Sequence, residues 1–242
     1  MQVPPVGGWQ RATVLEVRRE TPNAKTFRLA LPRPTPYLAG QHLVLRLTAP
    51  DGYRAQRSYS IATAPSPADG EEDQRSELEL TIELLPGGEV SSFLHEVVEP
   101  GDELEVRGPI GGYFVWAGDG PATLVGGGSG VVPLASMLRL ARRLGREDRV
   151  RLVVSTRRPS DLYYADELVG PQVRTVYTRE APPDHSRPIG RITAEDLAPA
   201  LLPDAVAYVC GTTGFADAAS DLLMGLGVPA ERIRVERFGP TG

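Results

Sequence analysis

Residues 122–144 read ATLVGGGSGVVPLASMLRLARRL and decide the fold of the second half of the chain. A short apolar strand, Ala122–Val125, runs into the glycine run Gly126–Gly130, and helical spacing of apolar residues follows over Val131–Leu144. Glycines at such a junction allow a sharp turn, and the helix start offers free N–H groups to a phosphate. The match to the fingerprint G-x-G-x-x-G is incomplete, because position 131 is valine. Two interpretations stay open, a nucleotide-binding loop and a merely tight strand–helix turn.

The rest of the second half alternates predicted strands with predicted helices. The strands are Val150–Ser155, Val173–Tyr177 and Ala205–Cys210, and the helices are Asp161–Leu168, Ala194–Leu202 and Phe215–Leu226. This alternation predicts βαβ units and a Rossmann-like parallel sheet covered on both faces.

The first half has the pattern of a small β-barrel or β-sandwich. Short strand candidates are separated by turn signals such as Pro100-Gly101-Asp102, and one short helix is predicted among them at Val90–Val98. The strands are Arg11–Arg18, Thr26–Leu31, His42–Thr48, Arg57–Ala62, Leu78–Leu84 and Glu103–Arg107. The polar stretch Ser66–Glu77 is expected to be a solvated loop. A linker near Trp116–Pro121 predicts two domains, 1–118 and 119–242.

Composition excludes several classes of protein. The 41% hydrophobic and 24% charged residues are typical of a globular protein, and no apolar run reaches the roughly 18 residues of a membrane-spanning helix. No signal peptide is visible, and one cysteine with three scattered histidines predicts no metal site. We therefore expect a cytoplasmic protein. The net charge of −5 argues against a nucleic-acid partner.

Charge is distributed unevenly along the chain. Residues 1–60 carry nine Lys/Arg against three Asp/Glu, and residues 61–118 carry two against thirteen. These charges either interleave on neighbouring strands and cancel, or leave a basic face that steers an acidic partner.

The stretch Arg57-Ser58-Tyr59-Ser60 combines three types of side chain that can bind a nucleotide-like ligand. An arginine can hold a phosphate through two hydrogen bonds, a tyrosine ring can stack on a flat heterocycle, and a serine can bond its edge. An ordinary alternating strand explains these four residues equally well.

Together these motifs resemble the ferredoxin–NADP reductase-like family, which includes the reductase modules of bacterial oxygenases. The resemblance runs from about Gln10 to Gly242, with the motifs in the family's order: Arg57–Ser60, Gly87–Ser91, Gly108–Gly111, Gly126–Pro133, Cys210-Gly211 and Glu236–Phe238. It implies an N-terminal antiparallel Greek-key FAD-binding barrel, followed by a Rossmann-like NAD(P)-binding domain.

The resemblance also implies site residues. Arg57 would hold the FAD pyrophosphate, Tyr59 would pack on the isoalloxazine, and Ser60 would lie near flavin N5. The full FAD set is Arg57, Ser58, Tyr59, Ser60, Ile61, Gly88, Val90 and Ser91. The NAD(P) set is Gly127, Gly128, Ser129, Arg157, Arg158, Thr178, Arg179 and Gly211. Cys210 would lie beside the nicotinamide and Phe238 near the flavin. Together with Ser60, these two residues form the implied catalytic group. The alternatives are that Cys210 is only a buried cysteine and Phe238 only a core aromatic.

The implied activity is transfer of hydride from NAD(P)H to FAD, followed by release of electrons. The chain lacks the four cysteines of a [2Fe–2S] domain, so we expect a stand-alone monomer that serves a separate acceptor, such as a ferredoxin or an oxygenase component. A reductase of free flavin or ferric chelates, and a non-catalytic flavin sensor, are the alternatives. The arginines at 157, 158 and 179 predict a preference for NADPH, unless they are only solvated strand ends.

Overall fold

The computed structural model describes residues 7–33, 35–65 and 76–239, so most of the loop expected at Ser66–Glu77 lies outside the described residues. The chain divides into two compact units, Met1–Ala117 and Gly118–Gly242. No described helix is long and apolar enough to cross a membrane.

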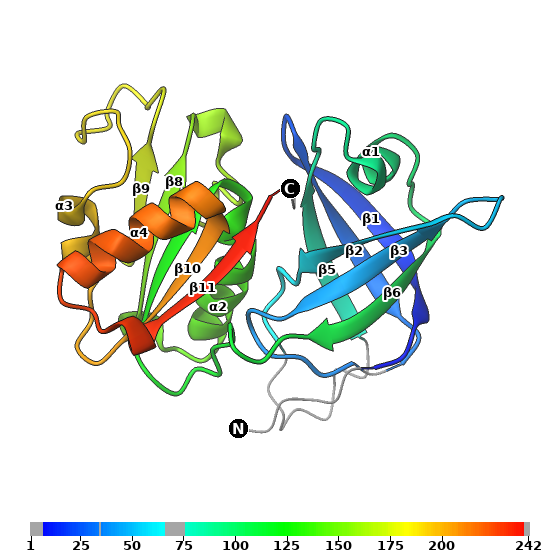
Figure 1. Cartoon of the computed structure of the whole chain (residues 1–242), viewed down its shortest axis with the longest axis horizontal. Helices are drawn as coiled ribbons and strands as arrows, with labels where there is room; N and C mark the ends of the chain where they lie inside the picture. Colours follow the sequence, from blue (N-terminus) through cyan, green and yellow to red (C-terminus); the bar gives the residue numbers. More distant parts are fainter. Residues whose placement is uncertain (1–6, 34, 66–75, 240–242) are drawn as a thin grey trace. The chain divides into compact units, whose positions relative to one another are not determined.

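The first unit is a six-stranded antiparallel sheet in the order β4-β3-β6-β1-β2-β5 (Figure 1). Its strands are β1 (Gln10–Thr21), β2 (Ala24–Leu31), β3 (His42–Thr48), β4 (Arg54–Ser60), β5 (Ser76–Glu83) and β6 (Glu103–Ile110). The strands alternate buried and exposed residues, and the buried set forms one apolar core that includes Phe27, Leu43, Leu45 and Leu80. The strand order is that of a Greek key, and the predicted fold class is confirmed.

The sheet curls on itself until its two edge strands meet. Just after β4, Ile61 forms an antiparallel bridge with Leu80 of β5, and the Ala62 amide donates to the Glu79 carbonyl at 2.8 Å. Helix α1 (Glu89–Glu96) follows β5 and inserts Val90 and Leu94 into the same core. Helix α1 also contacts β4.

The second unit is a five-stranded parallel sheet in the order β11-β10-β7-β8-β9. Its strands are β7 (Ala122–Gly127), β8 (Val150–Thr156), β9 (Val173–Tyr177), β10 (Val206–Thr212) and β11 (Ile233–Phe238). Counted along the unit, β9-β8-β7-β10-β11 is the order 3-2-1-4-5 of a dinucleotide-binding fold. The order reverses between β7 and β10, and such folds bind ligands at the carboxyl ends of the strands there.

Helices cover both faces of this sheet (Figure 1). Helix α2 (Val131–Arg143) packs on one face, whereas α4 (Thr213–Gly225) and the short α3 (Ala194–Leu197) pack on the other. The α4-side core is built from alternate residues of the strands, such as Val125, Val153 and Val209. Turns of 3-10 helix complete the unit at Gly128–Gly130, Glu147–Arg149, Pro159–Asp161, Ala198–Ala200 and Ala230–Arg232.

Three element predictions for this unit need correction. The helix predicted at Asp161–Leu168 is only a 3-10 turn and further turns, because Tyr164 adopts φ 54°, which no α-helix accommodates. The helix predicted at Ala194–Leu202 keeps one α turn and then tightens into 3-10 helix, where Pro199 has no amide to donate. Strand β11 was not predicted at all.

Candidate functional site

Strand β4 places the Arg57–Ser60 motif at the edge of the barrel. In the register with β3, Arg57 lies opposite Leu45 and Tyr59 opposite Leu43, and of the two only Tyr59 packs against the core. Tyr59 is half-buried against the core, and this burial raises the pKa of its hydroxyl to about 12. Arg57 is exposed and forms no ion pair with any carboxylate of the described residues; one of its guanidinium N–H groups donates to the Gln56 carbonyl at 2.8 Å. An arginine of this kind is free to bind an anion.

The beginning of α1 offers a second anion-binding feature next to β4. Gly88 is its N-cap and provides no side-chain cap, so the first amides of the helix have no intrahelical partner. The Val90 side chain is in the core, and the Ser91 hydroxyl is used inside the turn, where it accepts from the Leu85 amide at 3.2 Å and donates to the Gly88 carbonyl. These two predicted FAD residues can therefore meet a phosphate through their backbone N–H groups, and Arg57 with this helix end suits a pyrophosphate.

A residue that sequence reasoning missed lies next to Ser60. His42 is directly opposite Ser60 in the β3–β4 register, and Gly111 lies against its ring. The imidazole is half-buried, and this burial lowers its pKa. Only the strand register could have revealed this pair, because the two residues are far apart in the sequence. Of the other predicted FAD residues, Ser58 is exposed and Ile61 is fully buried.

The glycine loop lies at the carboxyl end of β7, where the strand order reverses. Gly128 adopts φ +55°, and a Cβ there would meet no atom within 4 Å, so the turn needs glycine and the space beside it is open. At Gly127 a Cβ would lie 2.6 Å from the ring of Phe215, which is in the first turn of α4, the helix that packs on this face. Gly127 is thus required by packing, and Gly128 and the half-buried Ser129 are left as the part that can face a pyrophosphate.

The end of β10 packs directly against this loop. A Cβ on Gly130 would overlap the Cys210 carbonyl, and one on Gly211 would lie 2.6 Å from Phe215. Cys210 also lies opposite Gly126 in the β7–β10 register. The predicted nicotinamide-side pair Cys210-Gly211 and the predicted pyrophosphate loop are therefore neighbours.

Cys210 has a half-buried acidic neighbour that the sequence did not reveal. Glu236 lies opposite Cys210 in the β10–β11 register. Burial, followed by the nearby Glu236 carboxylate, raises the pKa of the Cys210 thiol well above its usual range. Burial also raises the pKa of Glu236 to about 7, and among the described residues its Oε2 has no hydrogen-bond partner. Phe238 ends the same strand, half-buried and separate from the α4-side core cluster.

The four predicted 2′-phosphate residues come together where β8 and β9 end. The amides of Thr178 and Arg179 donate to the carbonyls of Thr156 and Arg157 at 2.9 and 3.0 Å. The side chains of Arg157, Arg158 and Arg179 are exposed. Arg158 forms an ion pair with Glu180 at 3.6 Å, so the local positive charge is partly neutralised.

Comparison with known proteins agrees with this geometry. Residues 11–115 match the model of the oxidoreductase FAD-binding domain, and residues 124–221 match that of the oxidoreductase NAD-binding domain. The ferredoxin–NAD(P)+ reductase component of a Pseudomonas putida naphthalene 1,2-dioxygenase system is 30% identical over 243 residues, which cover 96% of this chain and 70% of that protein. The chain belongs to the ferredoxin–NADP reductase-like family.

Other relatives match this chain over different fractions of their own length. A flavohemoprotein of Deinococcus radiodurans is 30% identical over 97% of this chain, and the chain spans 61% of that relative's length. The flavohem-like FAD/NAD-binding domain of a Vibrio cholerae nitric oxide dioxygenase superposes with a TM-score of 0.82 at 25% identity, covering 96% of this chain and 99% of that structure. The chain thus contains an oxidoreductase FAD-binding domain and an oxidoreductase NAD-binding domain, with FAD and NAD(P) as their cofactors.

Proposed function

We propose that this protein takes hydride from NAD(P)H onto FAD and passes the electrons to a separate redox protein. The observation that carries the proposal is that each unit offers its own phosphate-binding turn. The first has the exposed Arg57 on β4 and the uncapped N-terminal end of α1, a helix that contacts β4, and the second has the open Gly128 turn at the reversal of strand order. We assign FAD to residues 1–118 and NAD(P) to residues 119–242.

The chain's own side chains would mainly bind and orient. Arg57 would neutralise the FAD pyrophosphate, Tyr59 would present its ring to the flavin, and Ser60 would bond the flavin edge. Gly128 and Ser129 would hold the NAD(P) pyrophosphate, and Cys210 would border the nicotinamide. When bound, FAD accepts a hydride and releases electrons, so no side chain needs to act as a strong base.

The nature of the acceptor follows from the relatives. Reductase components of oxygenase systems favour a ferredoxin or an oxygenase component. The flavohemoprotein relatives favour a haem protein as a second candidate. Reduction of free flavin or ferric chelates, and a non-catalytic flavin sensor, remain the alternatives. Turnover with ferredoxin, a haem protein and ferric chelate, measured side by side, separates these acceptors.

Anaerobic titration tests the core of the proposal. The purified protein, reconstituted with FAD, should lose its yellow colour on addition of NADPH. A protein that takes up no FAD, or whose bound FAD stays oxidised, would refute it. A monomer in the cytoplasm is also proposed, and light scattering checks the monomeric state.

We further propose that NADPH is preferred over NADH. The three exposed arginines at the ends of β8 and β9 support this, because a guanidinium suits the 2′-phosphate. The ratio of kcat/KM for the two coenzymes measures the preference, and a ratio that favours NADH would contradict it.

A further inference from the structure

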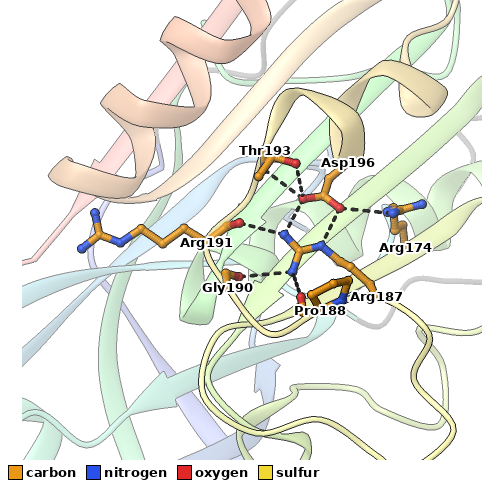
Figure 2. Close-up of polar contacts among 7 residues, drawn as sticks. All are labelled: Arg174, Arg187, Pro188, Gly190, Arg191, Thr193 and Asp196. Carbon is orange, nitrogen blue, oxygen red and sulfur yellow. Dashed lines mark hydrogen bonds and ion pairs between the residues drawn. The ribbon is translucent and has the colours of Figure 1, made fainter.

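A buried carboxylate organises the chain between β9 and α3. Asp196, only 2% exposed, is the third residue of α3 and accepts hydrogen bonds from the amide and hydroxyl of Thr193 (Figure 2). Arg187 donates to both of its oxygens, Nε at 2.6 Å and Nη2 at 2.7 Å, and Arg174 of β9 adds a contact at 3.2 Å. Burial by itself raises the pKa of Asp196, but the hydrogen bonds from Arg187 and Thr193 outweigh it and lower the pKa to about 2.

Arg187 also holds the backbone around it. Its remaining N–H groups donate to the carbonyls of Pro188, Gly190 and Arg191, at 2.6, 3.3 and 2.7 Å (Figure 2). One guanidinium thus joins three backbone carbonyls of an irregular segment to the first turn of α3. A lysine could keep the charge but could not make this set of bonds.

The segment that Arg187 holds is a closed loop. The Gly190 amide donates to the Tyr177 carbonyl at 3.0 Å, which joins the two ends of the loop 178–189. Inside the loop, the His185 ring packs edge-on against Tyr177, with 4.9 Å between ring centroids. Thr178 and Arg179, two of the proposed 2′-phosphate residues, follow Tyr177 at the start of this loop. Hydrogen bonds connect Asp196 through Arg187 and Gly190 to the Tyr177 carbonyl, directly before them in the chain.

We infer that Arg187 and Asp196 are positioning residues for recognition of the 2′-phosphate, because they fix the base of the loop that carries Thr178 and Arg179. This inference rests on the proposed preference for NADPH. Arg179 is exposed, so its alignment with a phosphate depends on a backbone that is ordered before the ligand arrives. Loosening the loop would add an ordering cost to binding. Ligands without the 2′-phosphate would not bear this cost.

The test compares two matched variants of the full FAD-loaded protein. Arg187→Lys keeps a cation beside Asp196 but loses the donors to the loop carbonyls. Arg174→Lys makes the same chemical change at the other arginine that contacts Asp196; this arginine lies on β9 and, among the described residues, forms no hydrogen bond to the loop. Calorimetric titration with 2′,5′-ADP and with 5′-AMP measures the 2′-phosphate contribution without turnover, and hydrogen exchange follows the Gly190 amide.

Arg187→Lys should weaken 2′,5′-ADP binding by about tenfold, change 5′-AMP binding by less than about twofold, and speed exchange at Gly190. The KM for NADPH should rise while kcat at saturation stays unchanged, and Arg174→Lys should resemble the wild type. Unchanged 2′,5′-ADP affinity, or equal losses for both nucleotides, would overturn the inference. A wild-type protein that binds both nucleotides equally would instead overturn the NADPH preference itself, and with it the inference; that result is read before any substitution is made.

Discussion

At the scale of single residues, Glu236 has the most unusual environment of the candidate site. Its pKa rises from 4.5 to about 7 because of burial. The folded protein therefore holds this proton more tightly than the unfolded chain, so stability should fall as the pH rises through the interval between these values.

We predict that Glu236→Gln removes this pH-dependent part of the protein's stability. Between about pH 5 and about pH 8, the melting temperature of the wild type should decline more than that of the variant. The exposed Glu231, changed to Gln, is the matched control and should follow the wild type. Parallel curves for the wild type and Glu236→Gln would contradict the burial of an uncompensated carboxyl group.

Arg57 carries a second prediction at this scale. Arg57→Ala should weaken FAD retention, because a charge-assisted contact to phosphate contributes roughly 1.5–3 kcal/mol. Flavin content after gel filtration and the Kd for FAD measure the loss. Arg54→Ala removes another exposed arginine of the same strand and should retain FAD. An equal loss of FAD in both variants would mean that the net positive charge of the strand, and not Arg57 itself, holds the cofactor.

At the scale of elements, the junction of β7, α2 and α4 depends on a close fit. We predict that Gly127→Ala destabilises the protein by about 1–3 kcal/mol, because its methyl group would press on the Phe215 ring. In a Phe215→Ala background the same change should cost less, and chemical denaturation of the four proteins of this cycle measures the coupling. Gly128→Ala, which adds strain at positive φ but meets no neighbour, should cost about 1 kcal/mol in either background. Additive effects of Gly127→Ala and Phe215→Ala would refute the packing explanation.

The elements also indicate what sequence patterns can predict. Alternating burial in β1 to β6 and the strand–glycine–helix junction of β7 and α2 are local signals, so these elements were predicted with their approximate bounds. The segment around Tyr163-Tyr164 was predicted as a helix. Its left-handed residue, Tyr164, is of a type that gives no sequence signal for this conformation. The neighbours of Cys210 and Ser60 were unpredictable for another reason. Glu236 and His42 reach them only through strand register, which is set by the whole sheet.

At the scale of the molecule, two units with separate cores predict separable binding functions. Arg57→Ala should lose FAD and keep its affinity for 2′,5′-ADP, whereas Arg179→Ala should keep FAD and lose that affinity. Both variants should be reduced poorly by NADPH, since the reaction needs both cofactors. Flavin content and calorimetry on each variant measure the two functions. A loss of both ligands in either variant would contradict independent sites.

The loop 178–189 has a consequence for protein engineering. Because the Tyr177–Gly190 hydrogen bond joins the ends of the loop and Arg187 holds its base, residues 178–186 can be exchanged as a unit provided that Arg187 is kept. A graft of different length would change the closure entropy only slowly, by about 0.6 kcal/mol for a doubling of loop length. The part of coenzyme recognition proposed for Thr178 and Arg179 could then be changed in one insert, while Arg157, Arg158 and the supporting sheet are left as they are.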